Sequence, residues 1–426
     1  MISLTRRWAG EDRGSRYRAI IVPACLVVVA VMTALLLARV RGPFGAAAAV
    51  LIVAGATAAG AVLLTRGPRP ARAAVALTAG LIGTAEAAGV LVPHVLARGS
   101  GPFMLAAALC LAAGVVLLVS GARDLFAAVP GWWRLLVVPA ALAVLVAVML
   151  TLPFAVAATS VPRTPVDPGT PGALGLAYRD VTFPASDGVQ LSGWYVPAGR
   201  SPHPGRAVVL LPGSGSTRSA VLPQAAVLAG RGYAVLLFDP RGHGDSDGTA
   251  MDFGWYGNAD VSGAVTFLTG LPGIDPAAVG AVGMSMGGEE AIGAAAADRR
   301  IRAVVAEGAT NRVADDKAWQ AQQFGAAGSV QGWLDEITYG AAGLLTAADQ
   351  PATLRDSAAQ AAPRPLLLIT AGNRPDESFA ADYIRAGSPA SVSLWNVPGA
   401  EHIRALATDP AQWPNRVDGF LSAALR

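Results

Sequence analysis

Ser285 lies in a sequence pattern that can turn a serine into a nucleophile. The pattern Gly283-Met284-Ser285-Met286-Gly287 follows an apolar run and precedes small residues that are compatible with a helix. This context is typical of a nucleophile elbow, a sharp strand-to-helix turn that exposes the serine hydroxyl above the end of a strand. The glycines relieve crowding in the turn, and the following helix points its N-terminal amides at any developing negative charge. A glycine-rich turn without chemistry would have the same short pattern, so the serine needs partners elsewhere in the chain.

A serine hydroxyl needs a base to take its proton, and histidine is the usual base near neutral pH. The chain has four histidines. His94 falls within an apolar run, and His203 precedes the first central strand that we predict, so neither is expected at the serine. His243 and His402 both follow predicted strands. Only His402 also comes after an acid-bearing loop that itself follows a strand, which gives the chain order serine, acid, histidine known from one class of catalytic triads.

Two neighbouring acids, Asp376 and Glu377, are candidates for orienting His402. Both lie in the segment 371–377, directly after a predicted strand. Aspartate is the commoner acid in this role, whereas the extra methylene of glutamate can make up for a displaced backbone. Both candidates stay open at this point. In an alternative interpretation, the two acids only favour the N-terminus of the next helix.

An oxyanion hole needs N–H donors that point to one place beside the serine. The loop 212–216 contains two glycines and ends the first central strand that we predict, so its amides can turn towards Ser285. We predict that the donors are the backbone N–H of Ser214 and the backbone N–H of Met286, the residue after the serine.

The elements that must position these residues alternate along the second part of the chain. Short apolar runs rich in β-branched residues alternate with helical stretches, and this pattern predicts a mostly parallel sheet covered by helices. Ligands bind at the carboxyl ends of such strands, where the Ser285 turn would lie. The predicted strands are 181–183 and 189–196, joined as a hairpin, then 207–211, 234–238, 279–282, 303–306, 366–370 and 392–397. The alternation lapses over 309–363, which we interpret either as a helical cap over the strand ends or as helices on the flank of the sheet.

Several motifs, in this order, make residues 178–426 similar to the α/β-hydrolase superfamily, particularly its serine-aminopeptidase-like and membrane-anchored branches. They are Val189-x-Leu-x-Gly-Trp-Tyr-Val-Pro197, Phe238-Asp-Pro-Arg-Gly-His-Gly-Asp-Ser246, Ile274-Asp-Pro276, Gly283-Met-Ser-Met-Gly-Gly288 and Val397 to His402. The resemblance implies that Ser285 is the nucleophile, that His402 is the base and that His243 belongs to a structural turn. The chain departs from the family pattern at Pro212, where members often have histidine, and at Pro375, where they commonly have the triad aspartate.

The first 160 residues have a different composition. They carry 13 arginines against four acids, whereas the remaining residues carry 19 basic and 25 acidic side chains. The basic charge therefore belongs to the apolar part of the chain, which indicates a membrane surface rather than nucleic acid. Five apolar runs approach the ~20 residues that span a bilayer as a helix. The predicted spans are 19–38, 46–64, 73–96, 103–119 and 135–158.

The expected organisation is thus a transmembrane region over 1–159, a proline-rich linker over 160–176 and an α/β-hydrolase domain over 177–426. With the N-terminus inside, the internal segments hold ten arginines and the external loops three, and such a bias sets orientation. Five spans would then place the hydrolase domain outside the cytoplasm. Glu86 and His94 lie in the third run, where ionisable residues are either functional or bonded within the bundle.

We expect a membrane-integral serine hydrolase that cleaves an ester or an amide. Its partners would be the lipid bilayer and a small-molecule or lipid ester, with peptides as a second choice. No cofactor or metal is expected, because Cys25 and Cys110 lie in separate apolar runs and offer neither a disulfide framework nor a zinc site. The alternatives are a catalytically idle domain that binds a ligand and a hydrolase that is auxiliary to transport or sensing by the membrane helices.

Overall fold

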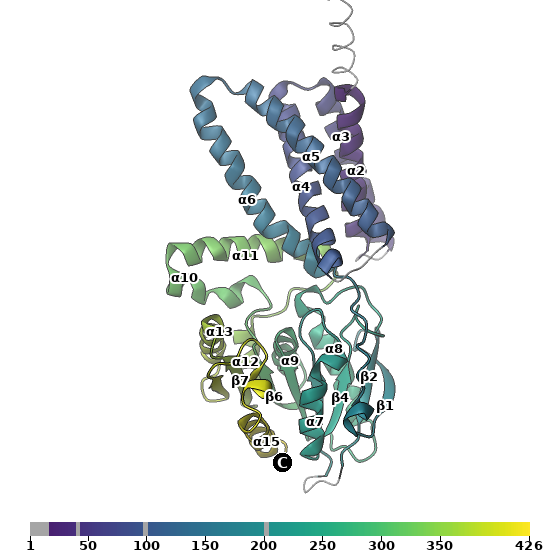
Figure 1. Ribbon diagram of the computed structural model, residues 1–426, viewed down its shortest axis with the longest axis vertical. Coiled ribbons are helices and arrows are strands. Elements are labelled where there is room, and N and C mark those ends of the chain that lie inside the picture. The colour runs from purple at the N-terminus through teal and green to yellow at the C-terminus, as the bar shows by residue number, and fades with distance from the viewer. Residues whose placement is uncertain (1–16, 40–42, 97–100, 200–203) are drawn as a thin grey trace, which may run out of the picture. The chain divides into compact units, whose positions relative to one another are not determined.

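The computed structural model describes residues 17–39, 43–96, 101–199 and 204–426, and the chain divides into two units (Figure 1). One unit runs to Pro162 and takes in Ile337–Ala347, and the other holds Arg163–Glu336 and Ala348–Arg426. Five long apolar helices precede a domain built on a mostly parallel sheet, as the sequence predicted. His203 lies outside the described residues.

Five helices of the first unit are long and apolar enough to cross a bilayer. The third helix begins before its apolar run, at Arg69, and the fourth ends after its apolar run, at Ala128. Within these extensions, Arg72 Nε donates to Asp124 Oδ2 at 3.1 Å in an ion pair. The helices are α2 (Val22–Ala38), α3 (Pro43–Arg66), α4 (Arg69–Leu96), α5 (Pro102–Ala128) and α6 (Arg134–Thr159).

Small residues allow α4 and α5 to pack closely. A Cβ atom on Gly80 would lie 2.9 Å from the carbonyl oxygen of Gly114, and a Cβ atom on Gly114 would lie 2.9 Å from the backbone nitrogen of Thr84. Because lipid provides no hydrophobic drive for two apolar helices to associate, such close backbone packing is what holds them together.

The two ionisable residues of the third predicted span bond within the bundle. Glu86 is buried, and the hydroxyl of Thr33 on α2 donates to its Oε1 at 2.7 Å. His94 Nδ1 lies 2.7 Å from the carbonyl oxygen of Val90, one turn earlier on α4. The contact of Glu86 joins two helices of the bundle, whereas that of His94 stays within α4.

Eight strands of the second unit form one sheet in the order β1-β2-β4-β3-β5-β6-β7-β8 (Figure 1). The first two form the predicted hairpin, β2 pairs antiparallel with β4, and the other six strands are parallel. The central strands are buried on both faces, which explains their continuous apolar sequences. The strands are β1 (Arg179–Pro184), β2 (Gln190–Val196), β3 (Ala207–Leu211), β4 (Ala234–Phe238), β5 (Val279–Met284), β6 (Ile301–Glu307), β7 (Leu366–Ala371) and β8 (Val392–Val397).

Helices cover both faces of the sheet and create two hydrophobic clusters. Alternate strand residues face opposite clusters, so Val209 packs with one and Leu210 with the other. On the Val209 face lie α8 (Gly257–Thr269), α9 (Met286–Ala297), α12 (Leu354–Ala361) and α13 (Pro375–Arg385). On the Leu210 face lie α7 (Leu222–Gly230) and α15 (Gln412–Ala424), and the short α14 (Ala405–Thr408) precedes α15.

Residues 309–363 are largely helical, with α10 (Trp319–Phe324) and α11 (Ala326–Leu345) preceding α12. Leu354 and Ala358 of α12 are buried in the cluster against the sheet, so this last part of the segment packs on the sheet. In α10, the Trp319 ring lies 5.4 Å from the Phe379 ring of α13.

We predict that Gly114→Leu destabilises the membrane helices, because its side chain would push α4 and α5 apart. Overpacking of this kind costs about 1–3 kcal/mol. Gly55→Leu is the matched control, since a Cβ atom at Gly55 meets nothing within 4 Å. The midpoint temperature for loss of monodisperse protein in detergent should fall for Gly114→Leu alone. Equal midpoints in the two variants would contradict close packing at Gly114.

Candidate active site

Ser285 occupies the turn between β5 and α9 with a strained backbone, φ 52° and ψ −122°. A side chain in such a conformation costs on the order of 1–3 kcal/mol and persists only where its surroundings enforce it. A Cβ atom on Gly283 would lie 2.2 Å from the carbonyl oxygen of Gly287, and one on Gly287 would lie 2.5 Å from that of Pro212. Both glycines of the pattern are therefore required by packing, and the turn has the geometry of a nucleophile elbow.

His402 follows β8, and its Nε2 lies 2.9 Å from Ser285 Oγ. Two backbone features position the ring. Ile403 has φ 52°, a conformation that is rare for a β-branched residue. Gly308, directly after β6, leaves room for the imidazole ring, because a Cβ atom at this position would lie 2.8 Å from His402 Cε1.

Of the two predicted acids, Glu377 bonds to His402 and Asp376 does not. Glu377 Oε1 accepts from His402 Nδ1 at 2.7 Å, and its Oε2 accepts from the backbone N–H of Ala371 at 2.8 Å. Asp376 instead forms an ion pair with Arg374 at 3.0 Å, and this contact lowers the pKa of the Asp376 carboxyl. Successive residues of a helix point about 100° apart, so in the first turn of α13 only one of the two acids faces inward.

The hydrogen-bonded chain Ser285–His402–Glu377 can activate a serine. The bond to Glu377 raises the pKa of His402 above its ordinary value, although burial of the ring acts in the opposite direction. Since Nδ1–H donates to Glu377, Nε2 of the neutral ring is the acceptor for the Ser285 hydroxyl. A proton taken from Ser285 would leave an imidazolium beside a buried carboxylate, which favours that proton transfer.

The two amides that we predicted for an oxyanion hole belong to the ends of neighbouring parallel strands, β3 and β5. A Cβ atom on Gly213 would lie 3.4 Å from Ser285 Cβ, so the loop of Ser214 runs beside the serine. Within the described part of the chain, neither the backbone N–H of Ser214 nor that of Met286 donates to an acceptor. Both N–H groups are therefore without a hydrogen bond within these residues.

Glu307 is a site residue that sequence reasoning missed. Its buried carboxylate accepts from the backbone N–H of Ala405 at 2.8 Å and from the indole N–H of Trp413 at 3.0 Å, and its carbonyl oxygen accepts from the backbone N–H of Ser285 at 2.7 Å. Burial raises the pKa of this carboxyl. Glu307 thus connects the serine turn to the segment after His402. The signal in the sequence was an acid at the end of an otherwise apolar strand, where a buried carboxylate needs partners.

A cavity of about 460 Å³ opens beside His402. Its apolar wall includes Val221, Met284 and Leu406, while Gln224 and Arg404 contribute polar groups. Largely apolar clefts of this size with a few polar groups are typical small-molecule sites.

The other described histidine of this unit, His243, lies in a buried turn. Its Nδ1 is 3.4 Å from the carbonyl oxygen of Arg241, and burial lowers its pKa. The Arg241 guanidinium bonds to Asp187 and Asp260 and so holds the turn in place. Among the described residues, no group of three or more His, Cys, Asp or Glu side chains is placed to hold a metal ion.

Comparison with known proteins gives a family match and several partial relatives. Residues 163–391 match the X-Pro dipeptidyl-peptidase (S15) family. A thiohydrolase of Aspergillus aculeatus is 39% identical over 132 residues, which are 30% of this chain and 40% of that protein. A polyketide transferase of a Penicillium species is 35% identical over 134 residues, or 31% of this chain and 45% of that protein. The chain thus spans less than half the length of these curated relatives. An esterase of Pyrococcus furiosus has a solved structure that is 27% identical and covers 63% of this chain and 98% of its own, with a TM-score of 0.49.

We predict that Glu377→Gln slows the reaction of Ser285 with a fluorophosphonate probe by about 10³–10⁴-fold, as neutralising the acid of such a chain does elsewhere. Asp376→Asn is the matched control and should react at close to the unmodified rate. Protonated His402 cannot take the serine proton, so labelling should fall as the pH drops through the His402 pKa. The labelling midpoint should lie above the ordinary histidine value of 6.5 in the unmodified protein and lower in Glu377→Gln. Equal, mild effects of both substitutions would contradict the role of Glu377.

Proposed function

Because the chain belongs to the X-Pro dipeptidyl-peptidase (S15) family, we propose that its α/β domain is a serine hydrolase with Ser285 as nucleophile, His402 as base and Glu377 as the orienting acid. The observation that carries this proposal is the continuous hydrogen-bonded chain through these three side chains, at distances of 2.9 and 2.7 Å. The strained turn at Ser285 supports it further, since strained backbone clusters at functional sites.

In the proposed reaction, Ser285 Oγ attacks the carbonyl carbon of the substrate while His402 Nε2 takes the serine proton. The oxyanion that forms accepts from the backbone N–H groups of Ser214 and Met286. His402 then gives its proton to the leaving group as the bond to that group breaks, and an acyl-enzyme remains on Ser285. Water, deprotonated by His402, releases the acid product and restores the serine.

For the substrate, we propose an acyl ester first and an X-Pro peptide second. The apolar cavity beside His402 suits an acyl or alkyl group, and the relative named as a thiohydrolase points to acyl chemistry. The family name supports the peptide. Esters and peptides would both react through an acyl-enzyme on Ser285. The preference for one over the other would therefore depend on how the groups around the scissile bond fit the site.

We predict that Ser285→Ala abolishes turnover while the protein stays folded, because the hydroxyl is the nucleophile. Purified full-length protein would be assayed with p-nitrophenyl butyrate and with alanyl-prolyl-p-nitroanilide, which separates the ester from the peptide proposal. Ser422→Ala on α15, far along the chain from the elbow, is the control and should keep full activity. Turnover that survives in Ser285→Ala would rule out this serine as the nucleophile.

We also propose that the α/β domain lies outside the cytoplasm. Five candidate transmembrane helices indicate membrane association, and the loops that an inside N-terminus leaves in the cytoplasm carry most of the arginines. The described arginines of these loops include Arg66, Arg69 and Arg134, whereas Arg39 lies at the other end of α2. The arginines in residues 1–16, as well as Arg41 and Arg98, lie outside the described residues.

A fusion of alkaline phosphatase to residue 426 should be active, because this enzyme forms its disulfides only outside the cytoplasm. A fusion after Gly67, in a loop that the arginines place inside, should be silent. The reverse pattern, with an active fusion at Gly67 and a silent one at 426, would overturn the proposed orientation and leave the hydrolase proposal untouched.

A further inference from the structure

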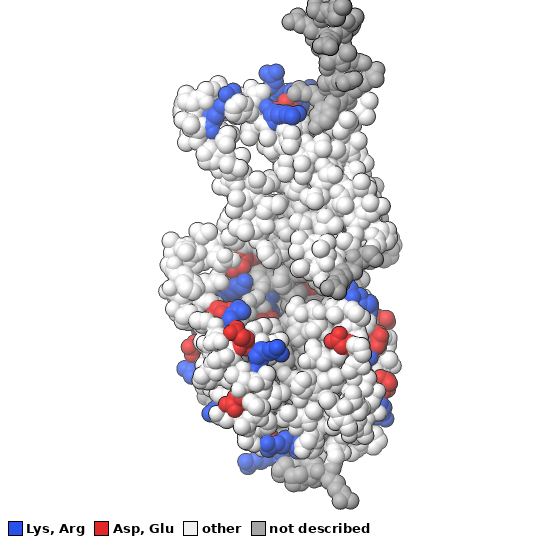
Figure 2. Space-filling view, viewed as in Figure 1, with Lys and Arg blue, Asp and Glu red and all other residues white. Residues whose placement is uncertain are grey.

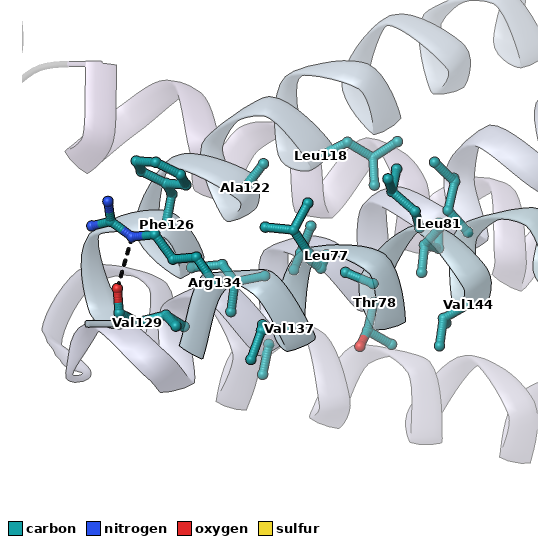
Figure 3. Close-up of a pocket in the computed structure, with 16 residues that line it drawn as sticks. Leu77, Thr78, Leu81, Leu118, Ala122, Phe126, Val129, Arg134, Val137 and Val144 are labelled. Atoms are coloured by element: carbon teal, nitrogen blue, oxygen red, sulfur yellow. Dashed lines mark hydrogen bonds between the residues drawn. The ribbon is translucent and has the colours of Figure 1, made fainter. Parts of the chain in front are cut away.

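An apolar slot runs between α4, α5 and α6 in the membrane unit (Figure 3). Its volume is about 560 Å³, and the side chains that line it are aliphatic over most of its length. The slot exists because α6 packs loosely: only 6% of an apolar 18-residue stretch of this span is buried, compared with 56% of such a stretch of α4. The lining residues include Leu77, Leu81, Leu118, Val137 and Val144.

The length of the slot matches one leaflet of a bilayer. Along α6 its lining runs from Arg134 to Leu145, which at ~1.5 Å per residue is roughly 16 Å. The hydrocarbon core of a bilayer is ~30 Å thick, so the slot reaches from one interface to about the midplane. An acyl chain of a phospholipid in that leaflet covers the same depth.

Arg134 stands at the interfacial end of the slot in a fixed orientation. Its Nε donates to the carbonyl oxygen of Val129 at 2.9 Å, and the guanidinium carbon lies 3.9 Å from the centre of the Phe126 ring (Figure 3). The two terminal nitrogens have no hydrogen-bond or ion-pair partner among the described residues. A guanidinium held in this way can donate both terminal groups to a phosphate.

The charge around this end of the slot is positive. Figure 2 shows basic side chains gathered at the end of the bundle where α6 begins. Arg123 lies near the C-terminal end of α5, which ends at Ala128. Arg72 is neutralised by Asp124, whereas neither Arg123 nor Arg134 forms an ion pair within the described residues. An anionic head group is therefore favoured over a zwitterionic one, whose cationic part the arginines would repel.

We propose that the slot binds one membrane phospholipid with an anionic head group, with an acyl chain between α4, α5 and α6 and the phosphate on Arg134. A helix from a second copy or another protein would fill the apolar slot but would leave the terminal nitrogens of Arg134 without an anionic partner. This site is independent of the hydrolase chemistry proposed above.

The head-group contact is tested by native mass spectrometry of the full-length protein with dioleoylphosphatidylglycerol or dioleoylphosphatidylcholine. The unmodified protein should bind one phosphatidylglycerol in preference to phosphatidylcholine. Arg134→Gln should weaken phosphatidylglycerol binding about fivefold and leave phosphatidylcholine unchanged, since one arginine near an anionic surface contributes about that factor. Arg123→Gln is the control from the same end of the bundle. An equal loss in both variants would indicate diffuse surface charge and overturn the site.

The slot itself is tested by filling it. Ala141→Phe places a ring in the slot and should reduce binding of both lipids, whereas Ala140→Phe, at a residue that does not line it, should not. Monodispersity on size exclusion chromatography verifies that each variant is folded. Unchanged lipid binding in a folded Ala141→Phe would overturn the proposal. A dimer of the unmodified protein that becomes a monomer in this variant would overturn it too, in favour of a second copy as the occupant.

Discussion

The backbone conformation of Ser285 is the constraint on which the α/β domain depends. β5 lies between β3 and β6, and contacts to both neighbours hold the serine at φ 52°: its backbone N–H donates to the carbonyl oxygen of Glu307, and Gly287 packs against Pro212. The same two strands lead to residues that contact the serine or its base: β3 precedes the loop of Ser214, and β6 ends at Glu307, directly before Gly308. The buried packing of three adjacent parallel strands therefore offsets the local strain and gathers the site at one edge of the sheet.

Much of this arrangement could be predicted from the sequence because local patterns carry it. Apolar runs marked each strand, the spacing of Gly283 and Gly287 marked the turn, and the chain order of serine, acid and histidine selected His402 from four candidates. These signals are short-range, so neither burial nor contacts were needed to interpret them. The structure confirms the fold that they predicted, with the predicted hairpin at one edge of the sheet.

The features that could not be predicted from the sequence depend on contacts between residues far apart in the chain. Which of Asp376 and Glu377 faces His402 follows from the rotation of α13 against β7, which the sequence does not specify. Glu307 acquires its role from Trp413, 106 residues later, and nothing near either residue indicates the pairing. Likewise, α4 and α5 extend past the apolar runs of the sequence, into segments where Arg72 and Asp124 form an ion pair that hydropathy does not indicate.

Ile403 has a strained backbone next to the candidate base, His402. A β-branched residue at φ 52° opposes folding, and glycine at this position would adopt the same backbone without strain. Glycine would also free the segment that carries His402, whose ring must stay 2.9 Å from the serine. The backbone strain at Ile403 and the fixed position of the His402 ring are therefore two effects of the same side chain.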